Sequence, residues 1–281
     1  MSISDSYSDK TYTEIKPFSG WLFLDFKELW KHKELFYFFV LKDIKIRYKQ
    51  TILGNLWGIL QPFITMLILS IFFGLWARIP ADGVPYPILV FTGLVPWIYF
   101  SKALNNAGAS IVNNSFLISK IYFPREIIPL TPVFACLWDF IFSFVVLIIL
   151  MFYFSVHPTI LIIITPFLIF LMMLAASGVG LFLSALSAKY RDVEYAMGFL
   201  LQIWMFSSPI IYPMSMVPEK YHLIYALNPL VGIIEGFRSV LLGTNPFPFE
   251  YVLISLIEST ILFVIGALFF KHTEYYFADV L

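Results

Sequence analysis

The residues of this chain that could take part in chemistry are few and scattered. Two acids, Asp139 and Glu258, lie inside long apolar segments. An ionisable group at membrane depth is costly and often marks a functional path, for example one for protons. The apolar segments offer almost no basic partner beyond Lys102. This sparseness favours a helix-packing role for the two acids, and a proton path is the open alternative.

No catalytic or metal-binding motif accompanies these acids. The sequence contains no GxxxxGK[ST] phosphate-binding loop, no HExxH and no GxSxG. The single cysteine, Cys136, excludes a disulfide framework and a CxxC zinc site. The histidines lie far apart at segment boundaries. We therefore expect no catalytic residue, no metal and no cofactor in this chain.

Most of the chain consists of apolar segments long enough to cross a membrane. Of the 281 residues, 60% are hydrophobic and 13% are charged, whereas a soluble domain carries about a quarter charged residues. A helix needs about 20 apolar residues to cross about 30 Å of hydrocarbon. We predict an all-α integral membrane domain, 51–270, whose six spans lie at about 52–77, 87–109, 130–155, 159–187, 196–217 and 251–270. The net charge of zero gives no indication of a nucleic acid partner.

The distribution of Lys and Arg predicts the orientation. With the N-terminus inside, the cytoplasmic segments hold nine of these residues before residue 50 and six later, and the outer segments hold three. Such an excess identifies the cytoplasmic side. Both termini, the polar tail 1–20 and the tail 271–281, are therefore expected in the cytoplasm. The tail 1–20 has no apolar core, so we expect no cleavable signal peptide.

The segment 21–50 combines an amphipathic helix with a basic stretch. Leu22, Phe26 and Leu29 recur at helical spacing over 21–36 among charged residues. Such a helix suits the membrane interface. A helix packed on a soluble partner is the alternative, because amphipathicity alone does not choose between the two.

Two connections are predicted to hold short helices of their own. On the cytoplasmic side, an Asn or Ser at 113–115 could cap a helix over 116–123 that Pro124 ends. On the outer side, Asn228, Pro229 and Gly243 suit the N-cap, first turn and C′ positions of a helix over 229–242. That helix is about 21 Å long, too short to cross. With a shorter helix before it, it predicts a re-entrant hairpin over 218–243.

Aromatic side chains gather in the second and fifth spans. Trp and Tyr near span ends usually form interfacial belts. Rings near mid-membrane could instead offer apolar faces to sugars along a conduit, and ordinary packing is the alternative. The residues considered for such a conduit are Trp97, Tyr99, Trp204, Phe206 and Tyr212.

Short segments running in order from residue 42 to the C-terminus resemble one known family. They are similar to the membrane subunits of ABC-2 type exporters, and most closely to the permeases of O-antigen and related polysaccharide export. Their order and spacing on a six-span plan carry the resemblance, and Lys42 departs from it because Arg is expected there. The segments are 42–54 (KDIKIRYKQTILG), 60–62 (LQP), 82–87 (DGVPYP), 93–97 (GLVPW), 120–125 (KIYFPR), 190–192 (YRD), 208–213 (SPIIYP), 228–238 (NPLVGIIEGFR) and 278–280 (ADV).

The resemblance implies a transport subunit of the cell inner membrane. It implies a homodimer joined to two copies of a separate ABC ATPase that binds ATP and Mg, and a lipid-linked polysaccharide as substrate. A two-fold pair also encloses a conduit more readily than six helices do. The helix over 21–36 would lie in the membrane–water interface, in contact with membrane lipids.

The resemblance also implies roles for individual residues. The segment 111–123 would couple to the ATPase, and the outer hairpin would form a periplasmic gate that contains Glu235 and Arg238. Cations pair with phosphate oxygens, so Arg47 and Lys49 are expected to contact the diphosphate of the substrate. The residues expected to couple to the ATPase are Ser115, Phe116, Leu117, Ile118 and Lys120.

Three other functions are open from the sequence. A sibling exporter would carry teichoic acid, capsule or a small hydrophobic compound. A proton-coupled secondary transporter would use Asp139 and Glu258 and need no ATPase. A membrane-embedded glycosyltransferase would need carboxylates gathered on a cytoplasmic loop, where Asp192 and Glu194 form a thin candidate pair.

Overall fold

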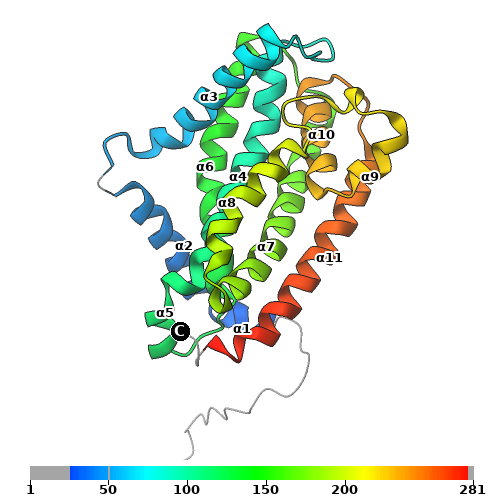
Figure 1. The fold of residues 1–281 in the computed structure, drawn as a ribbon. Helices are drawn as coiled ribbons and strands as arrows, with labels where there is room; N and C mark the ends of the chain where they lie inside the picture. The colour runs from blue at the N-terminus through cyan, green and yellow to red at the C-terminus, as the bar shows by residue number, and fades with distance from the viewer. Residues whose placement is uncertain (1–25, 50, 278–281) are drawn as a thin grey trace, which may run out of the picture.

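The computed structural model describes residues 26–49 and 51–277, and within these ranges the regular structure is entirely helical (Figure 1). The predicted tail 1–20, residues 21–25 of the predicted interface helix and the last residues, 278–281, lie outside the described ranges. The elements, in chain order, are α1 (Phe26–Lys31), α2 (Lys33–Tyr48), η1 (Gly54–Leu56), α3 (Trp57–Leu69), η2 (Ser70–Trp76), α4 (Tyr86–Asn113), α5 (Ser115–Lys120), α6 (Ile127–Tyr153), η3 (Ile160–Ile164), α7 (Thr165–Lys189), α8 (Asp192–Phe206), η4 (Met214–Met216), η5 (Glu219–Tyr221), α9 (His222–Ala226), α10 (Pro229–Leu242) and α11 (Phe249–Glu274).

Five continuous helical stretches are long and apolar enough to cross a membrane. Each overlaps a predicted span, so a multi-span membrane protein is confirmed. They are Gly54–Trp76, Tyr86–Asn113, Ile127–Tyr153, Ile160–Lys189 and Phe249–Glu274.

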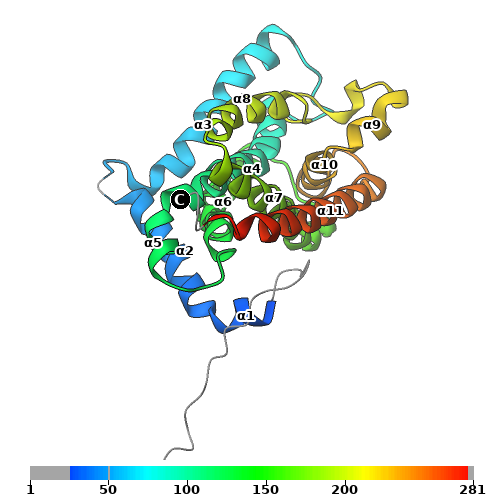
Figure 2. The same cartoon turned by 60° about the horizontal axis from the view of Figure 1, so that its bottom comes forward.

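The helix α4 forms the centre of the molecule. In its most apolar window 78% of the residues are buried, against 17% in the stretch that contains α3. Seen toward one end of the bundle, α4 lies within a ring of α3, α6, α7, α8 and α10 (Figure 2). The apolar surface of α3 faces outward over much of its length.

The helices α7 and α11 cross at two glycines. A Cβ atom built on Gly178 would lie 2.5 Å from the backbone of Leu262, and one built on Gly266 would overlap the backbone of Gly178. Small residues let helix backbones approach closely in membranes, where close packing is a main source of attraction between helices.

The predicted fifth span, 196–217, is wrong as a continuous helix. The helix α8 ends at Phe206, and its 15 residues correspond to about 22 Å, less than the hydrocarbon thickness. An irregular segment, 207–213, follows it. The sequence alone did not show this break, because the groups that stabilise the irregular backbone lie on α4 and α10.

The bounds predicted for the helix over 229–242 agree with the structure. The helix α10 spans Pro229–Leu242, the Asn228 side chain accepts a hydrogen bond from the backbone N–H of Leu230, and Gly243 ends the helix at φ 65°. The preceding segment, Glu219–Ala226, bends away from α10 by 111°. Every residue of α10 is buried, Glu235 and Arg238 included.

Two cytoplasmic-side predictions need different bounds. Helix continues beyond residue 36, since α2 runs to Tyr48 and contains most of the predicted basic stretch. The short helix α5 covers only Ser115–Lys120, and residues 111–113 belong to α4. The Asn114 side chain does not cap α5, because its amide donates to the carbonyl oxygen of Ser110 instead.

Candidate functional site

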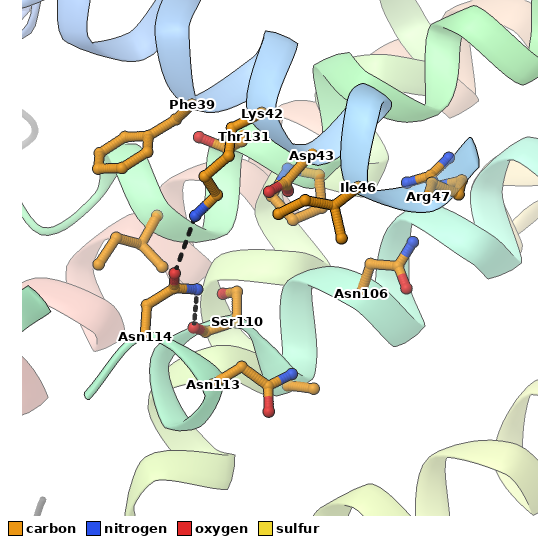
Figure 3. A pocket seen from close by; sticks show the side chains of 13 residues that line it. Phe39, Lys42, Asp43, Ile46, Arg47, Asn106, Ser110, Asn113, Asn114 and Thr131 are labelled. Carbon is orange, nitrogen blue, oxygen red and sulfur yellow. Dashed lines mark hydrogen bonds between the residues drawn. The ribbon is translucent and has the colours of Figure 1, made fainter. Parts of the chain in front are cut away.

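A polar pocket of about 440 Å³ lies between α2, the last two turns of α4 and the first two turns of α6 (Figure 3). We call it the α2 pocket. It combines charged groups, amides and hydroxyls with a smaller set of apolar side chains. The lining residues are Phe39, Lys42, Asp43, Ile46, Arg47, Asn106, Ala109, Ser110, Asn113, Asn114, Ile128, Thr131 and Pro132.

The side chain of Lys42 extends from α2 toward the end of α4 (Figure 3). Its Nζ atom donates to the Asn114 side-chain oxygen at 3.3 Å and lies 5.1 Å from the centre of the Phe39 ring. Both partners are uncharged. Within residues 26–49 and 51–277 Lys42 thus forms no salt bridge at the wall of the pocket.

The Asp43 carboxylate is half-buried beside this lysine. No hydrogen-bond partner of its side chain is found among residues 26–49 and 51–277. Burial raises the pKa of this carboxyl above its ordinary value, and the nearby Lys42 and Arg47 oppose the shift.

Arg47, at the end of α2, binds a buried carboxylate rather than solvent. Its Nη1 atom lies 2.8 Å from Oδ2 of Asp139, and the Nζ atom of Lys102 lies 3.7 Å from the same oxygen. These contacts join α2, α4 and α6 through one acid. The sequence showed only one basic partner for Asp139, because the second comes from a helix outside the spans.

The two cations predicted to contact diphosphate thus differ in their surroundings. Arg47 lines the α2 pocket but is paired with Asp139. Lys49 is exposed and lies outside the pocket. Sequence reasoning missed Lys42 and Asp43 as lining residues. The signal was available in the basic stretch, where positions 39, 42, 43 and 46 lie on one helical face.

The predicted gate pair, Glu235 and Arg238, lies inside the protein. The Nη1 atom of Arg238 is 2.8 Å from Oε1 of Glu235, and the guanidinium also donates to the carbonyl oxygens of Ile210 and Tyr212 at 2.9 and 3.2 Å. The Tyr86 hydroxyl donates to the carbonyl oxygen of Ile211 at 2.7 Å. These bonds satisfy the irregular backbone after α8, which has no helical partners.

The five predicted conduit residues fall into two groups. Trp97 and Tyr99 are buried in the core, 5% and 2% exposed. Trp204, Phe206 and Tyr212 lie around the break after α8 instead.

The second group is linked to the outer hairpin. The Trp204 indole N–H donates to the Asn228 side chain at 2.9 Å, and the Tyr212 hydroxyl accepts from Tyr225 at 2.9 Å. Phe206 is half exposed. The two groups meet at Trp204, which packs against the buried cluster that contains Trp97 and Tyr99.

The predicted coupling residues point in different directions. Phe116 is 72% exposed and Lys120 is exposed, whereas Ile118 packs into a buried cluster with Phe123 and Phe270. Ser115 and Leu117 are half-buried. Ile121 and Tyr122, which follow α5 within the predicted coupling segment 111–123 but were not singled out there, are exposed as well.

The described residues contain no cluster of three or more His, Cys, Asp or Glu side chains that could hold a metal ion. Asp192 and Glu194 lie exposed in the first turn of α8.

Comparison with known proteins places the pocket and α5 inside a matched region. The family described as ABC-2 type transporter matches residues 34–242. The chain is 30% identical to the O-antigen export system permease protein RfbA of Klebsiella pneumoniae over 241 residues, 85% of this chain and 92% of that relative. It is 27% identical to RfbA of Myxococcus xanthus over 217 residues (76% and 82%) and 26% identical to the polysialic acid transport protein KpsM of Escherichia coli over 210 residues (72% and 79%).

Proposed function

The chain belongs to the ABC-2 type transporter family, and on that premise we propose that it is the transmembrane subunit of an ATP-driven exporter of lipid-linked O-antigen or a similar polysaccharide. The observation that carries this proposal is the match to the O-antigen permease of Klebsiella pneumoniae, which covers 92% of that relative. A transport subunit has no catalytic site of its own in this proposal.

We place ATP binding, and the Mg that accompanies it, on a separate ABC ATPase, present in two copies. The sequence lacks a phosphate-binding loop, which supports a separate partner. Phe116, Ile121 and Tyr122, on α5 and directly after it, are exposed apolar side chains. Exposed apolar patches are common at protein interfaces, so we assign these side chains to the ATPase contact.

The conduit in this proposal lies between two copies of the chain. One chain buries Trp97 and Tyr99 in its own core, while the outward apolar face of α3 is open to lipid or to a second copy. The excess of Lys and Arg supports a cytoplasmic position for both termini. The membrane is the cell inner membrane.

In this proposal the part of the outer hairpin that moves is its first arm, Glu219–Ala226. Arg238, which is paired with Glu235 on the same helix, ties α10 to the segment after α8. Leu223, Ile224 and Leu227, on and after α9, are exposed. In this mechanism ATP binding by the partner moves α5 and shifts the spans against one another. The glycan enters from the cytoplasmic side, reducing end first. It passes Trp204, Phe206 and Tyr212 and leaves at the outer exit, which opens when α9 moves aside.

The test is the lipid-linked intermediate that accumulates when the gene is deleted. We expect an unexported, lipid-linked glycan on the cytoplasmic leaflet, cleared when the gene and its ATPase are restored. Restoration with an ATPase whose catalytic acid is replaced should fail. Export that continues with that ATPase would overturn the proposal and favour the proton-coupled transporter.

The chemical identity of the intermediate separates two substrate classes. The relatives include both O-antigen permeases and a polysialic acid transport protein. A lipid-linked O-antigen supports the first class, and a capsule-type polymer supports the sibling exporter.

A further inference from the structure

We propose that the α2 pocket recognises the phosphate-linked first sugar of the substrate, with Lys42 as the phosphate contact and Asp43 as an acceptor for sugar hydroxyls. The inference rests on the proposed function and adds a specific recognition site to it. It replaces Arg47 and Lys49 as the principal anion contacts.

The position of the pocket suits a group at the membrane surface. The pocket lies at the last two turns of α4 and the first two turns of α6, next to the turn into α5. The apolar parts of both helices lie beyond it. A lipid whose chains follow these helices would hold its phosphate near this level.

Of the two cations that line the pocket, Lys42 is the one available to bind a further anion. Arg47 is paired with Asp139 at 2.8 Å, and this pairing reduces its attraction for a further anion. The Nζ atom of Lys42 contacts Asn114 and the Phe39 ring, and no carboxylate lies within salt-bridge distance of it among residues 26–49 and 51–277. Asp43 is close enough to interact with its charge but does not pair with it, so the ammonium can form a charge-assisted hydrogen bond to a phosphate oxygen.

The carboxylate of Asp43 argues against a site for phosphate alone. An ionised carboxylate accepts hydrogen bonds and repels an anion. The amide of Asn106 makes one contact, to the sulfur of Cys136 at 3.6 Å. No hydrogen bond of the Asn113 side chain occurs within the described ranges. A carboxylate and amides with free capacity suit a ligand that carries hydroxyl groups beside its phosphate.

The remaining walls and the size also suit a sugar. The Phe39 ring and Ile46 offer an apolar surface to the C–H face of a pyranose. A volume of about 440 Å³ lies within the range of small-molecule sites, about 300–1,000 Å³. The pocket takes a glycosyl phosphate unit rather than a long chain.

Binding to the purified full-length chain in phosphatidylcholine nanodiscs tests this proposal. One probe is a long-chain alkyl diphosphate that carries one N-acetylglucosamine, and the other is the same alkyl diphosphate without sugar. We expect the wild-type chain to bind the sugar-bearing probe about tenfold more tightly, since one or two hydrogen bonds to a charged group supply this much.

Two variants separate the two contacts. Asp43→Asn should reduce the preference for the sugar-bearing probe to about twofold or less and leave binding of the sugar-free probe at least as tight. Lys42→Met should weaken the binding of both probes about tenfold. Lys45→Met, at an exposed position of α2 outside the pocket, is the matched control and should change neither.

Three results would overturn the proposal: equal wild-type binding of both probes, an Asp43→Asn variant that keeps the full preference, or displacement of the sugar-bearing probe by phosphatidylethanolamine in the nanodisc. The last would assign the pocket to a phospholipid headgroup. Asp43→Asn keeps the shape of the side chain, so equal thermal unfolding of variant and wild type excludes a folding defect. Glycan export by the wild-type complex is measured separately, so the proposed function can stand if the pocket assignment fails.

Discussion

At the scale of single residues, the structure assigns Asp139 a partner that the sequence did not show. One carboxylate lies between Arg47 and Lys102, and its second oxygen, Oδ1, is buried without a hydrogen bond. A carboxylate held between cations from two other helices acts as a packing contact that joins α2, α4 and α6. This arrangement favours a structural role for Asp139 over the proton path.

We expect Asp139→Asn to destabilise the protein by about 2–3 kcal/mol, because it leaves two partly buried cations without their charged acceptor. The measurement is thermal unfolding of the purified chain in detergent. Glu258→Gln is the control, since one carboxylate oxygen of Glu258 is buried without a partner, and we expect little change. Equal stability of the two variants would contradict the structural role.

Arg238 is the second residue whose position changes its interpretation. Its guanidinium is 2% exposed and donates to two carbonyl oxygens of the segment after α8 as well as to Glu235. A lysine cannot reproduce this planar set of donors. We therefore expect Arg238→Lys to lower the yield of folded protein sharply, measured by size-exclusion chromatography.

Glu235→Gln tests the same cluster from its other side. The substitution keeps an acceptor for Arg238 and leaves the carbonyl contacts in place, so the folded yield should fall less than in Arg238→Lys. If Arg238→Lys folds as well as the wild-type chain, the side chain does not hold the break after α8.

At the scale of elements, helix ends set by residues near in sequence were predicted correctly, and those set by residues distant in sequence were not. The bounds of α10 were predicted because Asn228, Pro229 and Gly243 act within the helix they delimit. The end of α8 was missed because Arg238 and Tyr86, distant in sequence, stabilise the irregular backbone there. The α2 pocket was missed for the same reason, since it forms only when α2 packs on α4 and α6.

The crossing of α7 and α11 gives a prediction at this scale. We expect Gly266→Val to separate the two helices and to reduce folded protein, because the added Cβ would occupy the backbone of Gly178. Protease resistance of the membrane-inserted chain measures the effect. Gly198→Val is the control on α8, where a Cβ meets no atom within 4 Å, and resistance there should stay close to that of the wild type.

At the scale of the whole molecule, the end of the bundle that carries α5 has a buried apolar cluster of its own, which joins Ile118 and Phe123 to Phe270. Beside it, Lys271 on α11 lies 2.8 Å from Glu126 just before α6. A displacement of α5 would therefore reach α11 through side chains already in contact, which suits a segment that receives a movement from an ATPase.

This packing predicts that the surface of α5 can be changed without loss of the fold. Phe116 is 72% exposed, so Phe116→Asp should leave the chain folded but remove co-purification of the proposed ATPase partner, because a carboxylate in an apolar contact is costly to desolvate. Tyr153→Asp introduces the same charge at a side chain that is 78% exposed, at the end of the span Ile127–Tyr153, and should leave the complex intact. Loss of the complex in both variants would point to a general folding defect, and retention in both would place the ATPase contact elsewhere on the molecule.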